Sequence, residues 1–66
     1  MPREELVAEF EHTRGRHGGR VSLAAPILGV TPFALARALF RAKRDGVHVR
    51  FYDDTKVLRR QRRAAA

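Results

Sequence analysis

The side chains of this chain that could do chemistry are mostly cations. The 66 residues hold 14 Lys and Arg against 7 Asp and Glu, a formal net charge of +7. A basic excess of this size indicates a polyanionic partner, most often nucleic acid, although an arginine-rich chain can also follow from a GC-rich coding sequence. Glu4, Glu5, Glu9 and Glu11 make the first 13 residues acidic, whereas the remainder becomes increasingly basic. This polarity suits a protein that turns one face towards phosphate.

Catalytic and metal-binding chemistry has little support in the sequence. His12, His17 and His48 show no metal-ligand spacing, and there is no cysteine to complete a site, so we expect all three histidines to be solvated. Asp53 and Asp54 are adjacent carboxylates, but in a short polar run they are better interpreted as turn formers. We therefore predict a protein that is not an enzyme and uses no metal, cofactor or small-molecule substrate.

Chain length and hydropathy further restrict the class of protein that the sequence can form. A chain of 66 residues can form one small domain of marginal stability, so oligomerisation or a bound partner is the expected support. No apolar run approaches the roughly 20 residues of a membrane helix, and the first residues lack the apolar core of a signal peptide. We expect a cytoplasmic protein with one domain over residues 1–58, followed by a flexible basic arm over residues 59–66.

Hydrophobic periodicity predicts a first helix over residues 2–13. Leu6, Val7 and Phe10 share one apolar face of this helix, and its first turn is acidic, as suits the positive end of the helix dipole. Residues 14–20 contain three glycines and are expected to form a loop.

Two further helices are predicted to meet at a tight turn. Ser22 is the expected N-cap of a helix that ends near Leu28, and Gly29 can adopt the left-handed conformation that ends it. Thr31 is expected to cap a third helix that begins with Pro32 and runs to about residue 45. Two helices joined by a short glycine-containing turn are typical of a helix-turn-helix, whose second helix enters the DNA major groove.

After residue 46 the hydrophobic period changes from helical to two. Val47, Val49 and Phe51 alternate with more polar positions over residues 47–52, which predicts a half-buried strand. A turn at residues 53–56 could return the chain as a second strand. The predicted fold class is therefore α+β, mainly α: a three-helix helix-turn-helix domain with a C-terminal strand or hairpin and a basic tail.

The outward face of the predicted third helix combines arginines with phenylalanines. With Leu35 as the inward direction and 100° per residue, the outward residues are Phe33, Arg37, Phe40 and Arg44. Arg37 can bind guanine O6 and N7 together, whereas Phe33 is equally suited to a thymine methyl group or to a protein surface. Phe40 lies too far along the helix to reach bases, and we expect the predicted strand or a partner subunit to cover it.

The remaining candidates would add affinity for the DNA backbone. Thr31, at the helix N-terminus, suits a phosphate or a base edge. The terminal arginines could lie in a minor groove or form a solvated tail. The cations expected to neutralise phosphate are Arg20, Arg41, Lys43, Arg44, Arg59, Arg60, Arg62 and Arg63.

The order of these parts resembles the Cro family of small phage repressors. LAAPILGVTPFALARALF (residues 23–40) matches its helix-turn-helix, and VHVRFYDDTKV (residues 47–57) matches the strand and hairpin that follow. The resemblance implies a transcriptional repressor that binds operator DNA as a homodimer, with the hairpin supporting dimer contacts. By the same match, the base-contacting residues would be Thr31, Phe33, Ala36 and Arg37.

Two alternatives stay open. A winged helix-turn-helix, as in excisionase-type phage proteins, would place the hairpin on DNA. An adaptor of a different class would bind another protein through Phe33, Ala36 and Phe40, because an apolar stripe rimmed by arginine is typical of a protein interface.

Overall fold

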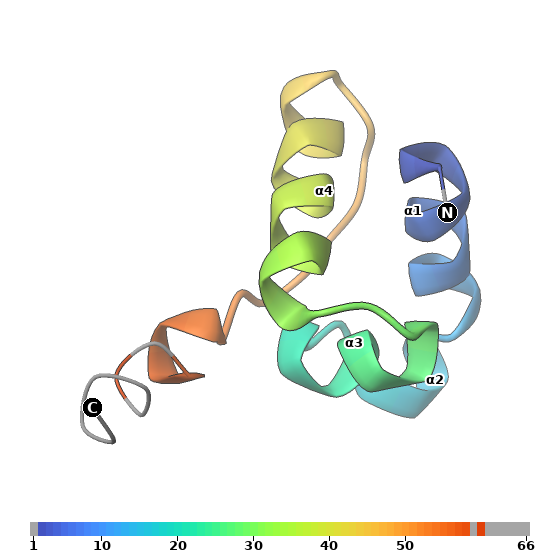
Figure 1. The fold of residues 1–66 in the computed structure, drawn as a ribbon. Helices are drawn as coiled ribbons and strands as arrows, with labels where there is room; N and C mark the ends of the chain where they lie inside the picture. The colour runs from blue at the N-terminus through green and yellow to red at the C-terminus, as the bar shows by residue number, and fades with distance from the viewer. Residues whose placement is uncertain (1, 59, 61–66) are drawn as a thin grey trace.

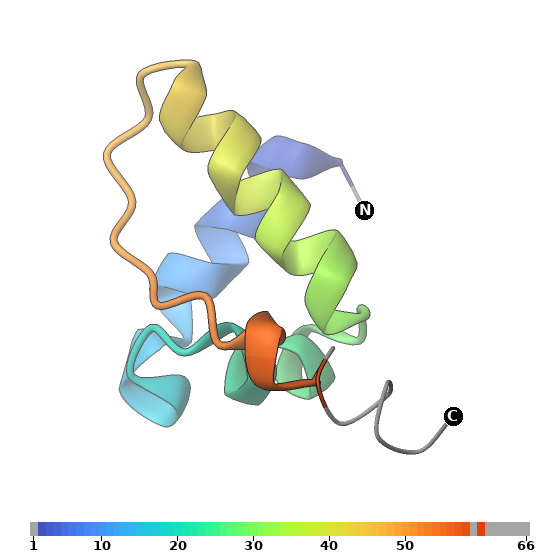
Figure 2. The same cartoon turned by 90° about the vertical axis from the view of Figure 1, so that its left-hand side faces the viewer.

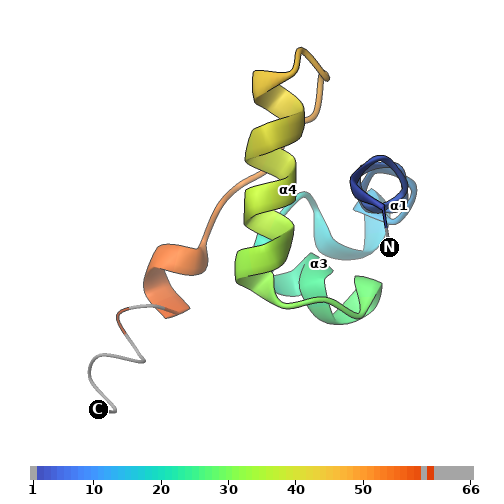
Figure 3. The same cartoon turned by 45° about the horizontal axis from the view of Figure 1, so that its top comes forward.

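The computed structural model describes residues 2–58 and residue 60, which form helices joined by short turns and, after α4, by a longer extended segment (Figure 1). The helices are α1 (Arg3–His12), α2 (Arg14–His17), α3 (Val21–Leu28) and α4 (Pro32–Arg44), followed by a helical turn over residues 55–58. α1 lies beside α4, and α2 and α3 cross below them, as the turned views also show (Figures 2 and 3). The predicted mainly helical fold is confirmed.

The first helix forms as predicted, and it contributes one wall of the core. Glu4 and Glu5 occupy its first turn, and Leu6, Val7 and Phe10 are buried. Phe10 is completely buried, in the same cluster as the apolar residues of α3 and α4. The acidic side of α1 is therefore held at a fixed position relative to α4.

The predicted glycine loop instead contains the helical turn α2, and it ends in two left-handed glycines. Gly18 has a φ of 62° and Gly19 a φ of 84°. A Cβ at Gly19 would lie 2.7 Å from a guanidinium nitrogen of Arg14, so the end of that arginine would have to shift. The positive φ is therefore the main reason for glycine at position 19.

The prediction that all the histidines are solvated is wrong for His17, whereas His12 and His48 are exposed. The ring of His17 is 2% exposed and stacks on Phe10 at a centroid distance of 4.5 Å. Its Nδ1 accepts a hydrogen bond from the Gly19 amide at 2.9 Å, and its Nε2 lies 3.0 Å from the Phe10 carbonyl oxygen. Because Nδ1 is an acceptor, Nε2 carries the hydrogen and donates to that carbonyl. These hydrogen bonds from the His17 ring to backbone groups stabilise a helical turn, in a segment that its glycines predict to be a loop.

The two helices in the middle of the chain form the predicted helix-turn-helix. Gly29, with a φ of 72°, ends α3, and the Thr31 hydroxyl caps α4 by accepting from the Ala34 amide at 3.1 Å. The chain turns by 106° between the two helix axes. Val21 and Leu39 are among the fully buried residues that lock this arrangement.

The predicted N-cap of α3 is wrong. The N-cap is Arg20, and Ser22 lies inside the first turn, where its amide donates to Asp54 Oδ1 at 2.8 Å and its hydroxyl donates to the other carboxylate oxygen. The Val21 amide donates to the Tyr52 carbonyl oxygen at 3.1 Å. The free amides of α3 are thus satisfied by a segment about 30 residues later, a cap that a rule based on adjacent residues does not detect.

The predicted hairpin is absent from the described residues. Residues 47–52 are extended, but their pairing is limited to one isolated parallel bridge between Arg20 and Tyr52. The segment instead packs Val49, and part of Phe51, against the helical core. The residues expected to return as a strand begin a helical turn, where Asp53 Oδ1 accepts from the Thr55 amide at 3.0 Å.

The predicted arm over residues 59–66 lies, apart from Arg60, outside the described residues. Within the described part of the chain, no single helix is long and apolar enough to span a membrane, although α3 and α4 counted together across their bend meet that criterion.

Candidate nucleic-acid interface

Three arginines form a stripe along the outer side of α4. Arg37, Arg41 and Arg44 are all exposed, and their spacing of four and three residues places them on one side of the helix. The opposite side carries the buried residues Leu35 and Leu39. We call these three residues the arginine stripe. It projects from the second helix of the helix-turn-helix, where a DNA-reading helix would present its side chains.

No residue of the arginine stripe has an ion-pair partner within residues 2–58 and 60. The ion pairs of the described residues join other cations to carboxylates: Arg3 to Asp45 at 2.8 Å, Arg14 to Glu11 at 2.6 Å and Arg20 to Asp54 at 3.9 Å. The stripe is therefore available to an external anion, without first breaking an intramolecular bridge.

The carboxylates are placed so that they do not neutralise this stripe. All four glutamates belong to α1. Each aspartate is engaged: Asp45 pairs with Arg3, Asp53 accepts from Thr55, and Asp54 accepts from Ser22. The charge polarity seen in the sequence is thus a spatial polarity, with α1 acidic and the outer side of α4 basic.

Asp54 is the carboxylate with the most specific environment. It is 8% exposed and accepts hydrogen bonds from the amide and hydroxyl of Ser22. Burial by itself raises the pKa of Asp54, but the Ser22 hydroxyl and amide, its own backbone amide and the Arg20 charge together outweigh burial and lower that pKa below 3.8. The ionised form is therefore the one that caps α3.

The other predicted base-contacting residues differ in how exposed they are to an incoming DNA. Thr31 is exposed, and although its oxygen accepts the cap bond, its hydroxyl hydrogen can still be donated to a phosphate. Phe33 is partly buried. Ala36 is 6% exposed and belongs to the core cluster, so its predicted contact with a base is corrected: its methyl group packs inside the domain.

Phe40 has the protein contact expected for it. The Phe51 ring from the extended segment meets it edge-on, with ring centroids 4.9 Å apart and planes at 81°. Phe40 nevertheless stays 49% exposed. Edge-to-face pairs of this kind contribute about 0.5–1.5 kcal/mol beyond the burial of their area.

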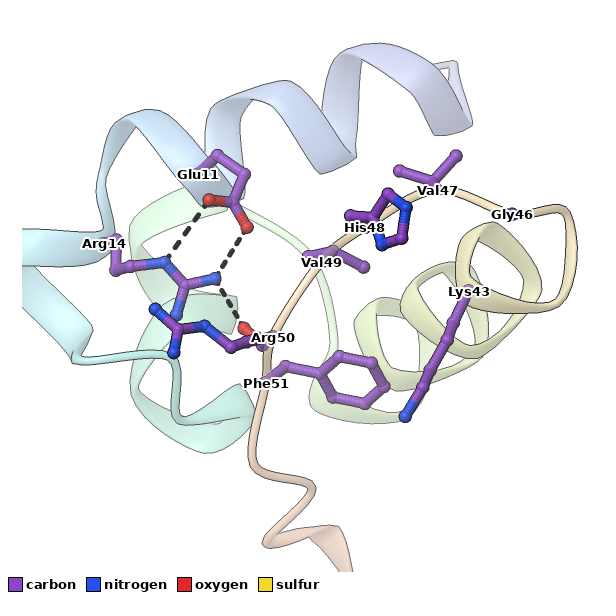
Figure 4. Close-up of a pocket in the computed structure, with 9 residues that line it drawn as sticks. All are labelled: Glu11, Arg14, Lys43, Gly46, Val47, His48, Val49, Arg50 and Phe51. Atoms are coloured by element: carbon purple, nitrogen blue, oxygen red, sulfur yellow. Dashed lines mark hydrogen bonds and ion pairs between the residues drawn. The ribbon is translucent and has the colours of Figure 1, made fainter.

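The remaining predicted phosphate contacts are scattered. Arg20 is exposed beside Asp54, at the start of α3, and Arg60 is exposed. Lys43 lies away from the arginine stripe, on the rim of a groove (Figure 4). Arg59, Arg62 and Arg63 lie outside the described residues.

Arg14 has a structural role that sequence reasoning missed. Its guanidinium group pairs with Glu11 and donates to the Arg50 carbonyl oxygen (Figure 4). It also lies over the Phe10 ring, 5.3 Å from the centroid. The spacing of Glu11 and Arg14 is visible in the sequence as a helical i,i+3 pair. The contact with residue 50 depends on the tertiary fold and left no local signal.

Comparison with protein-family models, curated proteins and solved structures finds no match to this chain. Among the described residues, no group of three or more His, Cys, Asp or Glu side chains could hold a metal ion.

Proposed function

We propose that the protein is a DNA-binding transcriptional regulator that inserts α4 into the major groove. The observation that carries this proposal is a 106° helix-turn-helix whose second helix presents three exposed arginines with no ion pairs in the described chain. An α-helix about 10–12 Å across fits a major groove about 12 Å wide.

The members of the stripe would divide affinity and specificity between them. Arg37 lies nearest the N-terminus of α4, so it would bind guanine O6 and N7 with both branches of its guanidinium group. Arg41 and Arg44 would neutralise backbone phosphates, together with the Thr31 hydroxyl at the start of the helix. Binding would release counterions, so affinity would fall steeply with salt.

A homodimer on a palindromic site is the expected binding form. A chain of this length is marginally stable alone, and two copies would place their α4 helices about 34 Å apart, one turn of DNA. Sedimentation velocity of the protein with and without a palindromic duplex tests this part, because a strict 1:1 complex would exclude it.

The salt dependence of binding to a random-sequence duplex tests the DNA-binding surface. Fluorescence anisotropy would compare the unmodified chain with Arg41→Ala, Arg44→Ala and a matched control, Arg50→Ala, which removes the same charge from the groove shown in Figure 4. Each stripe variant should reduce the slope of log K against log[salt] by about 0.9, the value for one lost phosphate contact. An equal change in the control would overturn the assignment of the interface to α4.

Arg37→Ala tests specificity on a duplex selected for tight binding. It should weaken the selected duplex by roughly 1–3 kcal/mol more than the random duplex. Equal loss on both would reduce Arg37 to a phosphate contact.

The protein-adaptor alternative is favoured by one observation, the 49% exposure of Phe40. The burial of Ala36 interrupts the apolar stripe that this alternative requires. A Phe40→Ser variant that keeps its DNA affinity but loses a protein partner would support it.

A further inference from the structure

A groove runs along the extended segment, and Arg37, Arg41 and Arg44 of the arginine stripe are not among the residues that line it. Its wall is formed by residues 46–51, facing Glu11 and Arg14 on one side and Lys43 on the other (Figure 4). This hollow of about 830 Å³ continues into a second one of about 360 Å³, which shares Arg14, Arg50 and Phe51 and reaches Tyr52. The two hollows together follow the extended chain for roughly 20 Å, the length of about six residues of a strand.

The backbone along this groove is extended but unpaired. Its ends are fixed, because the Val47 amide donates to the Ala42 carbonyl at 2.9 Å and the Tyr52 amide donates to the Gly19 carbonyl at 2.8 Å. Between them, over residues 48–51, the Arg50 carbonyl oxygen is the single backbone group with a protein partner in the described chain, and that partner is Arg14. A fixed extended segment with unpaired N–H and C=O groups is a template to which another strand can add.

The side chains around the groove favour an acidic occupant. Lys43 and Arg50 line it with no ion pair in the described part of the chain, whereas Glu11 is already neutralised by Arg14. Val49 and Phe51 provide an apolar floor between these cations. A second copy of residues 47–52 would bring another Arg50 to a basic rim, so charge favours a different, acidic strand.

We propose that this groove binds an extended acidic peptide of a partner protein, which adds as a strand to residues 48–51. Backbone hydrogen bonds would supply affinity, alternate apolar side chains would contact Val49 and Phe51, alternate carboxylates would face Arg50, and Lys43 on the rim would add charge attraction for the acidic peptide. The proposal does not depend on DNA binding, because no residue of the arginine stripe lines the groove. It gives a regulator a surface through which to recruit another protein.

The test uses a fluorescein-labelled hexapeptide in which glutamate and valine alternate. Binding to the full chain is measured by anisotropy, and the site is located by amide chemical-shift changes in two-dimensional NMR. We expect the changes to concentrate on residues 46–52. Changes confined to the outer side of α4, or no binding at millimolar peptide, would overturn the proposal.

Two controls separate strand addition from simple charge attraction. Lys43→Glu and Arg50→Glu should each weaken the peptide about tenfold, whereas Arg16→Glu, an equal charge change at an exposed position of α2 outside the groove, should change affinity by less than about twofold. N-methylation of alternate peptide amides should abolish binding in one register and leave it nearly unchanged in the other, because a strand presents alternate amides to its neighbour. Equal tolerance of both methylated peptides would exclude a strand.

Self-association is the competing result. If the chain dimerises in the absence of peptide with the same amides perturbed, and the hexapeptide cannot compete, the groove holds a second copy and the proposal is wrong.

Discussion

The helical body over residues 3–44 and the C-terminal segment over residues 47–58 are stabilised in different ways. The helices contain their own backbone hydrogen bonds and share one buried cluster that includes Phe10, Leu35 and Leu39. Residues 47–52 of the segment make no hydrogen bonds to one another, and the segment is held by contacts with α2, α3 and α4. It also contributes to the body, because Tyr52 and Asp54 satisfy the first amides of α3. The helix-turn-helix is therefore completed by residues that follow it in the chain.

The largest expected effect comes from the core of the body. Leu39→Ala removes a fully buried side chain between the helices and should cost about 2–5 kcal/mol, enough to unfold much of a domain this small. Thermal denaturation followed by circular dichroism measures the loss. The matched control is Leu23→Ala, at a position that is 47% exposed on α3. Similar losses in the two variants would mean that the core does not lie where the structure places it.

The second prediction tests the contribution of the segment to α3. Asp54→Ala removes the acceptor of the Ser22 amide and hydroxyl, and it should cost about 0.5–2 kcal/mol, as loss of a helix cap does. Hydrogen exchange should accelerate first at the amides of Val21 and Ser22. Asp53→Ala is the neighbouring control, because Asp53 accepts from Thr55 and should affect residues 55–58 alone. Equal effects on α3 from both variants would contradict the cap.

The third prediction follows from the lowered pKa of Asp54. Because its pKa in the folded chain lies below the ordinary 3.8, the carboxylate stabilises the fold above that value. This stabilisation is lost as pH falls from about 3.8 through the folded pKa. Urea denaturation between pH 5 and pH 2 should show a steeper loss of stability for the unmodified chain than for Asp54→Asn, which has no charge to titrate. Parallel pH profiles would mean that the carboxylate gains nothing from Ser22 and Arg20.

The same contrast explains how far the sequence could predict the structure. The ends of α4 follow from adjacent residues, because a Thr-Pro start and Gly46 at its close require no distant partner. The exposure of Arg37 and Arg44 follows from helical periodicity. The alternation in residues 47–52 correctly identified Val49 as buried, whereas Val47 is 45% exposed. A period of two shows which side is apolar and does not show what covers it. Helices cover it here, so the expected sheet is absent from the described chain.

The missed parts of the candidate site share one physical cause. The Asp54 cap on α3 and the Arg14 contact with residue 50 depend on side chains that bind backbone groups 32 and 36 residues away. The buried ring of His17 likewise binds backbone groups, those of Phe10 and Gly19, which adjoin the helical turn. A prediction from local propensity considers only the neighbours of each residue in the chain, and it therefore assigns these residues to solvent or to turns. The prediction that Ala36 contacts a base is a smaller error of the same kind, because Ala36 is buried. A helical wheel gives the direction of a side chain around the helix axis, but it does not give the width of the surface that packs against the helix.

The smallest expected effect concerns the contact by which Phe51 holds the segment on α4. A double-mutant cycle of Phe40→Ala and Phe51→Ala should give a coupling free energy of about 0.5–1.5 kcal/mol, because the rings meet edge-on at 4.9 Å while Phe40 is still half exposed. The coupling is measured from urea denaturation of the two single variants and the double variant. Pairing Phe51→Ala with Leu23→Ala, whose side chain is exposed on α3, provides a cycle expected to be additive. A zero coupling for the phenylalanine pair would mean that the segment is held by its anchored ends alone, and that Phe40 is free to serve as a docking residue on the outer face of α4.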